Sequence, residues 1–143
     1  MVNEIIDGLS VTLSEAFNGV TIYSESILQG FNEPCFFILN LTSEETRLLG
    51  NRAKRNMSFD IHYFPESKTA PKEECHRVAE TLYPLLRQIT LLDGSKLLGL
   101  GLNYEVVDGV LHFYIEFKPV IRYMDNVPIE NMETIEVTEG VKV

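Results

Sequence analysis

The stretch that decides the fold is residues 100–117, LGLNYEVVDGVLHFYIEF. Asp108-Gly109 separates two runs of alternating apolar and polar side chains, which is typical of a β-hairpin with a two-residue type I′ turn. On one face this turn pairs apolar residues: Val106 with Leu111, Tyr104 with Phe113, Leu102 with Ile115 and Leu100 with Phe117. The other face pairs Glu105 with His112, Asn103 with Tyr114 and Gly99 with Lys118. The stretch therefore predicts antiparallel strands with one buried face.

A second, longer hairpin is predicted over residues 35–64. Residues 35–41, CFFILNL, are apolar on both alternating faces, as in a central strand covered on two sides. In residues 57–63, MSFDIHY, the odd-numbered side chains are apolar, whereas Ser58, Asp60 and His62 share the other face. Polar residues between the two runs lead to a turn at Gly50-Asn51, so the outer end of this hairpin is polar and basic. The β-branched residues 20–23 predict one further short strand.

Two amphipathic helices complete the pattern. In residues 3–17 apolar side chains recur at three- and four-residue steps, with Asn3 as the N-cap and Asn18-Gly19 as the stop. The second helix begins at Pro71, continues as an apolar stripe from Cys75 to Ile89, kinks at Pro84 and ends at residues 93–95. Beyond it, Gly99-x-Gly101 indicates a strand bend or a close backbone approach, because no helix follows as a dinucleotide-binding loop requires.

The predicted order of elements is α-β-β-β-α-β-β, which makes an α+β fold. We expect a single domain over residues 1–124, with a mostly antiparallel four- to five-stranded sheet and two helices packed on one face. Residues 125–143 carry five acidic residues against one lysine and are predicted to form an acidic C-terminal arm. Within this arm, Ile135 and Val137 belong to a possible short strand over residues 134–138.

Composition excludes several classes of protein. The 143 residues include 12 Lys and Arg against 21 Asp and Glu, a net charge of −9, and 45% are hydrophobic. This composition favours one folded domain and disfavours sequence-specific binding to nucleic acid, which needs clustered basic residues. No apolar run approaches the ~18 residues that span a bilayer, and no signal peptide is apparent. We therefore predict no membrane association and reduced thiols at Cys35 and Cys75.

No motif for metal binding or catalysis is apparent. Cys75 and His76 are adjacent on a helix and point in different directions, so neither forms a metal motif, and we predict no metal site and no cofactor. Two pairs are able to orient an imidazole, Asp60-His62 along one strand and Glu105-His112 across the hairpin. No nucleophile elbow accompanies either pair, so a small hydrolase-like enzyme is the minor alternative.

Arg47, Arg52, Lys54 and Arg55 form the only basic cluster of the sequence, at the tip of the longer hairpin. One interpretation is a solvated loop. The other is a contact element that docks onto an acidic partner surface.

Several segments taken together resemble one protein family. They are VNEIIDGL (2–9), EPCFFI (33–38), GNR (50–52), FDIHYFP (59–65), EEC (73–75) and YEVVDGVLHF (104–113). In order and spacing these segments resemble small tail terminator, or tail completion, proteins of contractile-tailed phages and phage-like elements of Gram-positive bacteria. The resemblance covers residues 2 to about 122.

The resemblance implies a structural virion protein. Such α+β subunits form a hexameric ring that caps the tail tube, ends its elongation and presents a surface to the neck connector. The implied partners are further copies of the chain, the tube protein, the connector and, as a further candidate, the sheath. Assembly is implied in the host bacterial cytoplasm, and the final location is the tail–neck junction. A neck adaptor or head-closure protein is the alternative.

The interface hypothesis combines these observations. The basic tip, with Arg47, Arg52, Lys54 and Arg55, contacts the tube, the sheath or a neighbouring subunit, and Ile135 and Val137 contact a neighbour through the C-terminal arm. If carboxylates line the lumen of the ring, DNA passes through it without sticking to the wall.

Overall fold

The computed structural model describes residues 1–24 and 30–124, which form two helices and eight strands. In chain order these are α1 (Val2–Ala16), β1 (Thr21–Tyr23), β2 (Cys35–Arg47), β3 (Arg52–Phe64), α2 (Pro71–Leu85), β4 (Gln88–Thr90), β5 (Lys96–Leu98), β6 (Leu100–Val107), β7 (Val110–Phe117) and β8 (Val120–Arg122). The expected C-terminal arm, with Ile135 and Val137, lies outside the described residues.

Six of these strands form one sheet, in the order β1-β2-β3-β7-β6, and β8 pairs with β3 beyond the end of β7. All pairs are antiparallel except β1 with β2, which run parallel. The predicted α+β class and the mostly antiparallel sheet are confirmed, and the predicted order holds except for three short strands that were missed: β4, β5 and β8.

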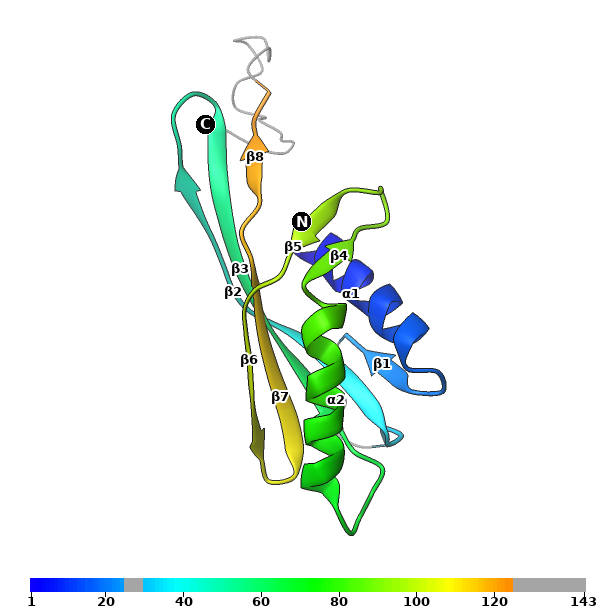
Figure 1. Ribbon diagram of the computed structural model, residues 1–143. Helices are drawn as coiled ribbons and strands as arrows, with labels where there is room; N and C mark the ends of the chain where they lie inside the picture. The colour runs from blue at the N-terminus through cyan, green and yellow to red at the C-terminus, as the bar shows by residue number, and fades with distance from the viewer. Residues whose placement is uncertain (25–29, 125–143) are drawn as a thin grey trace.

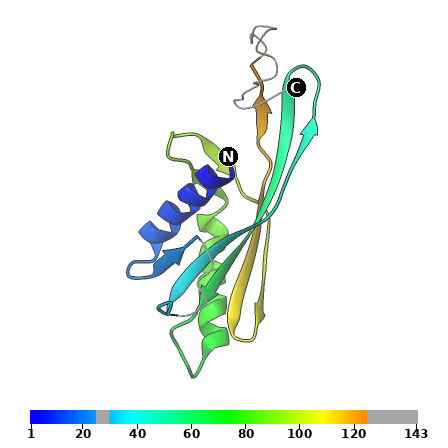
Figure 2. The same ribbon diagram turned by 180° about the vertical axis from the view of Figure 1, so that it is seen from behind.

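Both helices cover the same face of the sheet, as predicted (Figure 1). Seen from behind, the opposite face carries no helix (Figure 2). Fully buried side chains from α1, α2 and the inner faces of the strands fill the layer between helices and sheet; the largest are Phe36, Phe59, Phe113, Phe117, Ile5, Leu9, Leu13, Ile38, Met57, Ile61, Leu82 and Leu86. These side chains occupy the apolar positions of the periodic sequence patterns.

The hairpin of β2 and β3 is longer than the layer of helices that covers it. One half of each strand lies under the helices, and the other half extends beyond them with the turn at its tip (Figures 1 and 2). We call residues 41–56, the outer halves of the two strands with their turn, the distal hairpin. β8 lies along this segment, since Ala53 pairs with Ile121 and Lys54 with Val120.

The second helix is shorter than predicted. It ends at Leu85, and residues 88–98 form the separate hairpin of β4 and β5, in which Ser95 donates hydrogen bonds to the Asp93 carboxylate. Pro84 lies in the last turn of the helix, where its ring disfavours any continuation. Ile89 is nevertheless buried, so the apolar stripe passes from helix to strand. The first helix also differs at its start, because Met1 and not Asn3 precedes it as the N-cap.

The register of the β6–β7 hairpin is correct near the turn and wrong at the far end. Val106 pairs with Leu111 and Tyr104 with Phe113, but beyond Asn103 the register shifts, so that Leu100 faces Glu116 and not Phe117. Gly101, with φ of 60°, lies at this irregularity.

Gly99 marks the close backbone approach that the sequence predicted. A Cβ atom at this position would lie 2.1 Å from the carbonyl oxygen of Leu86. The Gly99 N–H also donates to the carbonyl of Arg87 at 2.8 Å. The end of α2 is therefore joined tightly to the start of β6.

Candidate assembly interface

The distal hairpin has two faces, which follow from strand alternation. Arg55 pairs with Glu45 and Arg47 with Ala53, so these side chains share the face that is continuous with the core. Arg52 and Lys54 lie on the opposite face. The structure thus divides the basic cluster predicted from the sequence into two pairs on opposite faces.

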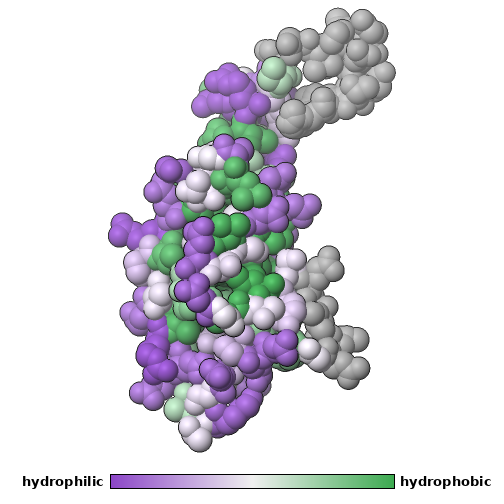
Figure 3. All heavy atoms as spheres, turned by 90° about the vertical axis from the view of Figure 1, so that its right-hand side faces the viewer, coloured by the Kyte–Doolittle hydropathy of each residue, from purple (hydrophilic) through white to green (hydrophobic). Residues whose placement is uncertain are grey.

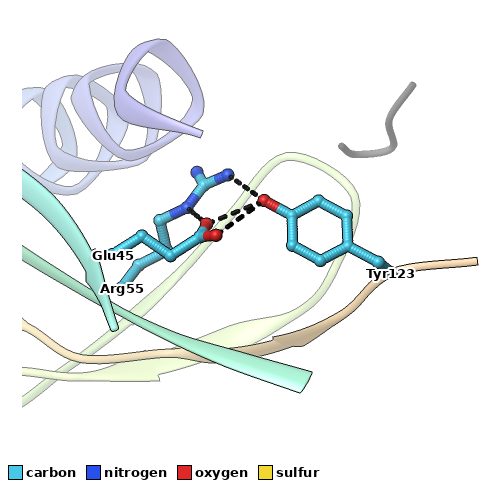
Figure 4. Close-up of polar contacts among 3 residues, drawn as sticks. All are labelled: Glu45, Arg55 and Tyr123. Carbon is cyan, nitrogen blue, oxygen red and sulfur yellow. Dashed lines mark hydrogen bonds and ion pairs between the residues drawn. The ribbon is translucent and has the colours of Figure 1, made fainter. Parts of the chain in front are cut away.

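Arg55 is held in an internal network on the first face (Figure 4). Its Nε donates to Glu45 Oε1 at 2.6 Å, and the Tyr123 hydroxyl donates to the same carboxylate at 2.8 and 3.0 Å. The Arg55 guanidinium lowers the pKa of Glu45, and Glu45 raises the pKa of Arg55. Because its charge is matched within the chain, Arg55 attaches β8 to the hairpin and is not a free contact residue.

The other three basic residues of the cluster are exposed, and so is Arg122 of β8. Arg52 lies directly opposite Arg122 in the β3–β8 ladder, and like charges in that position repel each other. Among residues 1–24 and 30–124, none of Arg47, Arg52, Lys54 and Arg122 forms an ion pair. Arg52, Lys54 and Arg122 share one face and form a cationic surface with the chemistry of a contact for an acidic partner, whereas Arg47 lies on the other face.

The charge of this region differs in sign from the rest of the chain. The distal hairpin and residues 120–124 together contain five basic residues and two acidic ones, a net charge of +3. The remaining residues contain seven basic and nineteen acidic ones, a net charge of −12. The sequence missed the contribution of Arg122 and Tyr123, because the isolated triplet of β8 has no periodicity that predicts its pairing with β3.

An acidic surface lies on α1. This helix carries Glu4, Asp7 and Glu15, all exposed, and no basic residue. A shallow groove beside it is lined by Ser10, Val11, Ser14, Glu15, Val20 and Ile22. Figure 3 shows this side of the molecule, where hydrophobic residues gather in the middle of the face between hydrophilic margins. A surface of mixed apolar and acidic character is suited to contact with a basic partner.

The helix-free face of the sheet brings Asp60, His62 and His112 together. His62 and His112 are direct partners in the β3–β7 ladder, and Asp60 lies two residues before His62 on the same face. Asp60 Oδ2 lies 2.8 Å from His62 Nε2 and 3.2 Å from His112 Nδ1. The sequence placed these residues in two separate pairs, because nothing in a single sequence sets the register between β3 and β7.

The predicted pair of Glu105 and His112 faces each other in the ladder, but the two side chains have other partners. The Glu105 carboxylate accepts a hydrogen bond from the Tyr114 hydroxyl at 2.8 Å. Partial burial and this bond raise the pKa of Tyr114 to about 12. The predicted ladder pairing of Glu105 with His112 is therefore confirmed, but His112 contacts Asp60 and forms no hydrogen bond with Glu105 among the described residues.

Among the residues that the structure describes, no nucleophile lies beside this cluster. In the described part of the chain, no serine, threonine or cysteine forms a hydrogen bond with His62 or His112. Cys35 and Cys75 are both buried, and burial raises the pKa of each thiol, that of Cys35 to about 11. His76, next to Cys75, is exposed and lies 2.8 Å from the Tyr104 hydroxyl.

The chain matches a known protein family. The family model described as phage tail terminator protein matches residues 4–127, whereas no curated protein matches the chain. Neither of the described helices combines the length and apolar character needed to cross a membrane. The family consists of structural proteins of the phage virion tail, which contact other tail and neck proteins. This chain, with its helix-covered sheet and cationic distal hairpin, belongs to the phage tail terminator protein family.

Proposed function

We propose that this protein caps the tail tube as a hexameric ring, ends tail elongation and presents a surface to the neck connector. The observation that carries the proposal is the distal hairpin, a long extension of two strands that no helix covers. Its exposed cations have no ion-pair partner among the described residues. Membership of the phage tail terminator protein family, whose members are structural proteins of the virion tail, supports the proposal.

A closed ring needs two different complementary patches on every subunit. The first is the cationic surface of Arg52, Lys54 and Arg122. The second is the outer face of α1, where Asp7 and Glu15 are exposed. In this arrangement the distal hairpin of one subunit lies on α1 of its neighbour. Opposite charges then favour this head-to-tail contact and disfavour contacts between identical patches.

The acidity of the remaining chain suits a ring through which DNA passes. With a net charge of −12 outside the distal hairpin and β8 segment, a lumen formed by these residues would repel phosphates. DNA would then slide past the wall without binding it. A high-resolution structure of the assembled ring that shows a basic lumen would contradict this part of the proposal.

Charge exchange tests the ring contact. The double variant Arg52→Glu/Lys54→Glu is expected to lose ring formation on tail tubes assembled from the cognate tube protein. Adding Asp7→Lys and Glu15→Lys restores opposite charges across the contact, so the quadruple variant is expected to regain rings. Negative-stain electron microscopy of the tube ends measures both outcomes.

The control is Lys68→Glu/Lys72→Glu, which reverses two cations outside the distal hairpin and leaves rings intact. A different result would contradict the proposed contact between neighbouring subunits: the quadruple variant stays defective while Asp7→Lys/Glu15→Lys alone forms rings normally. In that case the cationic surface contacts the tube or the sheath. If the Arg52→Glu/Lys54→Glu variant forms normal rings, the cationic surface has no role in capping.

A further inference from the structure

We propose that Asp60, His62 and His112 bind one divalent transition-metal ion of the zinc class. The three side chains come from neighbouring strands and share the face of the sheet opposite the helices. Two imidazole nitrogens and one carboxylate oxygen are a ligand set that such ions use commonly. This inference is independent of the ring contact proposed above.

The distances between the ligand atoms fit a coordination sphere. Oδ2 of Asp60 lies 2.8 Å from His62 Nε2 and 3.2 Å from His112 Nδ1, and all three atoms lie within 4.8 Å of one another. Around a tetrahedral zinc ion with bonds of about 2.0–2.1 Å, ligand atoms are separated by roughly 3.3 Å. Small rotations of the side chains therefore suffice to admit an ion between them.

The burial of Asp60 is a second, separate observation. Asp60 is 6% exposed, and it is the one buried charged side chain among the described residues. Its Oδ1 atom is buried and accepts no hydrogen bond within the described part of the chain. A buried acceptor without a partner destabilises the fold, and does so more strongly when it carries charge. A bound dication would offset this cost by neutralising the carboxylate.

The site is partly exposed and leaves one position open. The side chains of His62 and His112 are 20% and 22% exposed, so the cluster lies at the surface of the sheet and not in the core. Three protein ligands leave a fourth tetrahedral position for water. The nitrogen ligands disfavour Mg²⁺ and Ca²⁺, which prefer oxygen. Bound metal would link β3 to β7 in the middle of the sheet.

Zinc titration of the metal-stripped full chain tests the site. Isothermal titration calorimetry is expected to show one zinc ion per chain and no binding of Mg²⁺. His62→Ala, His112→Ala and Asp60→Asn each weaken zinc binding by about 100-fold or more, because each removes a direct ligand. The matched control is His76→Ala, which removes the remaining histidine of the chain and leaves zinc affinity unchanged.

Thermal unfolding gives a second readout. Zinc is expected to raise the Tm of the wild type and of His76→Ala, and to leave the Tm of the three ligand variants unchanged. Cobalt substitution is expected to give a visible spectrum of nitrogen and oxygen ligands without a thiolate band, because both cysteines are buried.

Three results would overturn the proposal. They are a wild-type chain that binds no stoichiometric zinc, equal binding by the wild type and the ligand variants, and a thiolate band in the cobalt spectrum. The first result needs no variant, so a variant that fails to fold does not weaken the test.

Discussion

The two halves of the β2–β3 hairpin differ sharply in the burial of their side chains. In the half under the helices, Phe36, Ile38, Phe59 and Ile61 are fully buried. In the distal hairpin, the β2 residues from Leu41 to Arg47 are all exposed, and Leu49 at the turn is 85% exposed. The same two strands, whose ladder has one register shift between Asn40 and Thr42, thus have a buried half and a half in which the β2 residues face solvent.

In the proposed assembly, this difference lets one element serve two purposes. The buried half contributes to the free energy of folding through apolar contacts. The distal half contributes few such contacts, and its regular pairing presents Arg52 and Lys54 at a fixed place beyond the helices. Stability and assembly are therefore expected to respond to different substitutions within one hairpin.

The largest effect on stability is expected in the buried half. Phe59→Ala removes a fully buried ring that packs edge-on against Phe117, with ring centroids 5.9 Å apart. It is expected to lower the free energy of unfolding by about 3–5 kcal/mol. Leu49→Ala, in the distal hairpin, is the control and is expected to change it by less than about 0.5 kcal/mol. Urea unfolding measures both, and equal losses would remove the distinction between the halves.

Glycine substitutions extend the same comparison. Gly99→Ala, between β5 and β6, places a Cβ 2.1 Å from the Leu86 carbonyl oxygen and 2.7 Å from Ile115 Cδ1. A loss of about 3 kcal/mol is expected because backbone must move. Gly50→Ala, in the distal turn, adds a Cβ that meets no atom within 4 Å. Because the backbone there has φ of 72°, which alanine disfavours, a loss of about 1 kcal/mol in the free energy of unfolding is expected. Chemical denaturation that ranks Gly50→Ala as the more harmful change would contradict this assignment.

The start of α2 predicts a pH dependence of stability that is centred on Glu74. Although partial burial opposes the shift, hydrogen bonds from the Tyr63 hydroxyl and the N–H groups of Glu66 and Ser67 lower the pKa of Glu74. The carboxylate therefore stabilises the fold above the ordinary pKa of 4.5, and this contribution is lost as pH falls through the lowered value.

Glu74→Gln is accordingly expected to destabilise the protein by about 1–2 kcal/mol at pH 7. The difference from wild type should shrink in acid. Glu73→Gln, at an exposed neighbouring position, is the control and should have little effect at any pH. Unfolding curves at several pH values measure this, and a difference that stays constant down to pH 3 would contradict the role of Glu74.

A smaller effect is expected where β8 joins the distal hairpin. Tyr123→Phe removes the hydroxyl that donates to Glu45, while the Arg55–Glu45 pair remains. A loss of about 0.5–1 kcal/mol is expected, with faster amide hydrogen exchange confined to β8. The control is Tyr83→Phe, whose hydroxyl makes no hydrogen bond within the described residues. Exchange that also accelerates in β7 would show that β8 supports the buried half.

The sequence predicted the parts of the fold that have a strong local signal. The alternation of residues 57–63 and the Asp108-Gly109 turn placed β3, β6 and β7 correctly, because period and turn chemistry act locally. A bend or close approach at Gly99-x-Gly101 was predicted, but the register shift beyond Asn103 and the end of α2 at Leu85 were not. The predicted apolar stripe does continue past Pro84 to the buried Ile89, so apolar periodicity alone could not show the change from helix to strand.

The candidate sites were also predicted only in part, because local patterns are visible in the sequence and contacts between distant segments are not. Arg52 and Lys54 were found because basic residues cluster in the sequence. That Arg55 differs from them could not be predicted, because its partner Tyr123 is 68 residues away in the sequence. The pairing of His62 with His112 could not be predicted either, because it depends on the register between β3 and β7.

The central claim is that the distal hairpin serves assembly and not folding. The most direct test is tail length, measured by electron microscopy in a terminator-deficient phage complemented with Arg52→Glu/Lys54→Glu. Since both side chains are exposed, the free energy of unfolding of the isolated variant should lie within about 0.5 kcal/mol of the wild-type value. The account predicts tails of irregular length without heads. Tails of normal length joined to heads would contradict it.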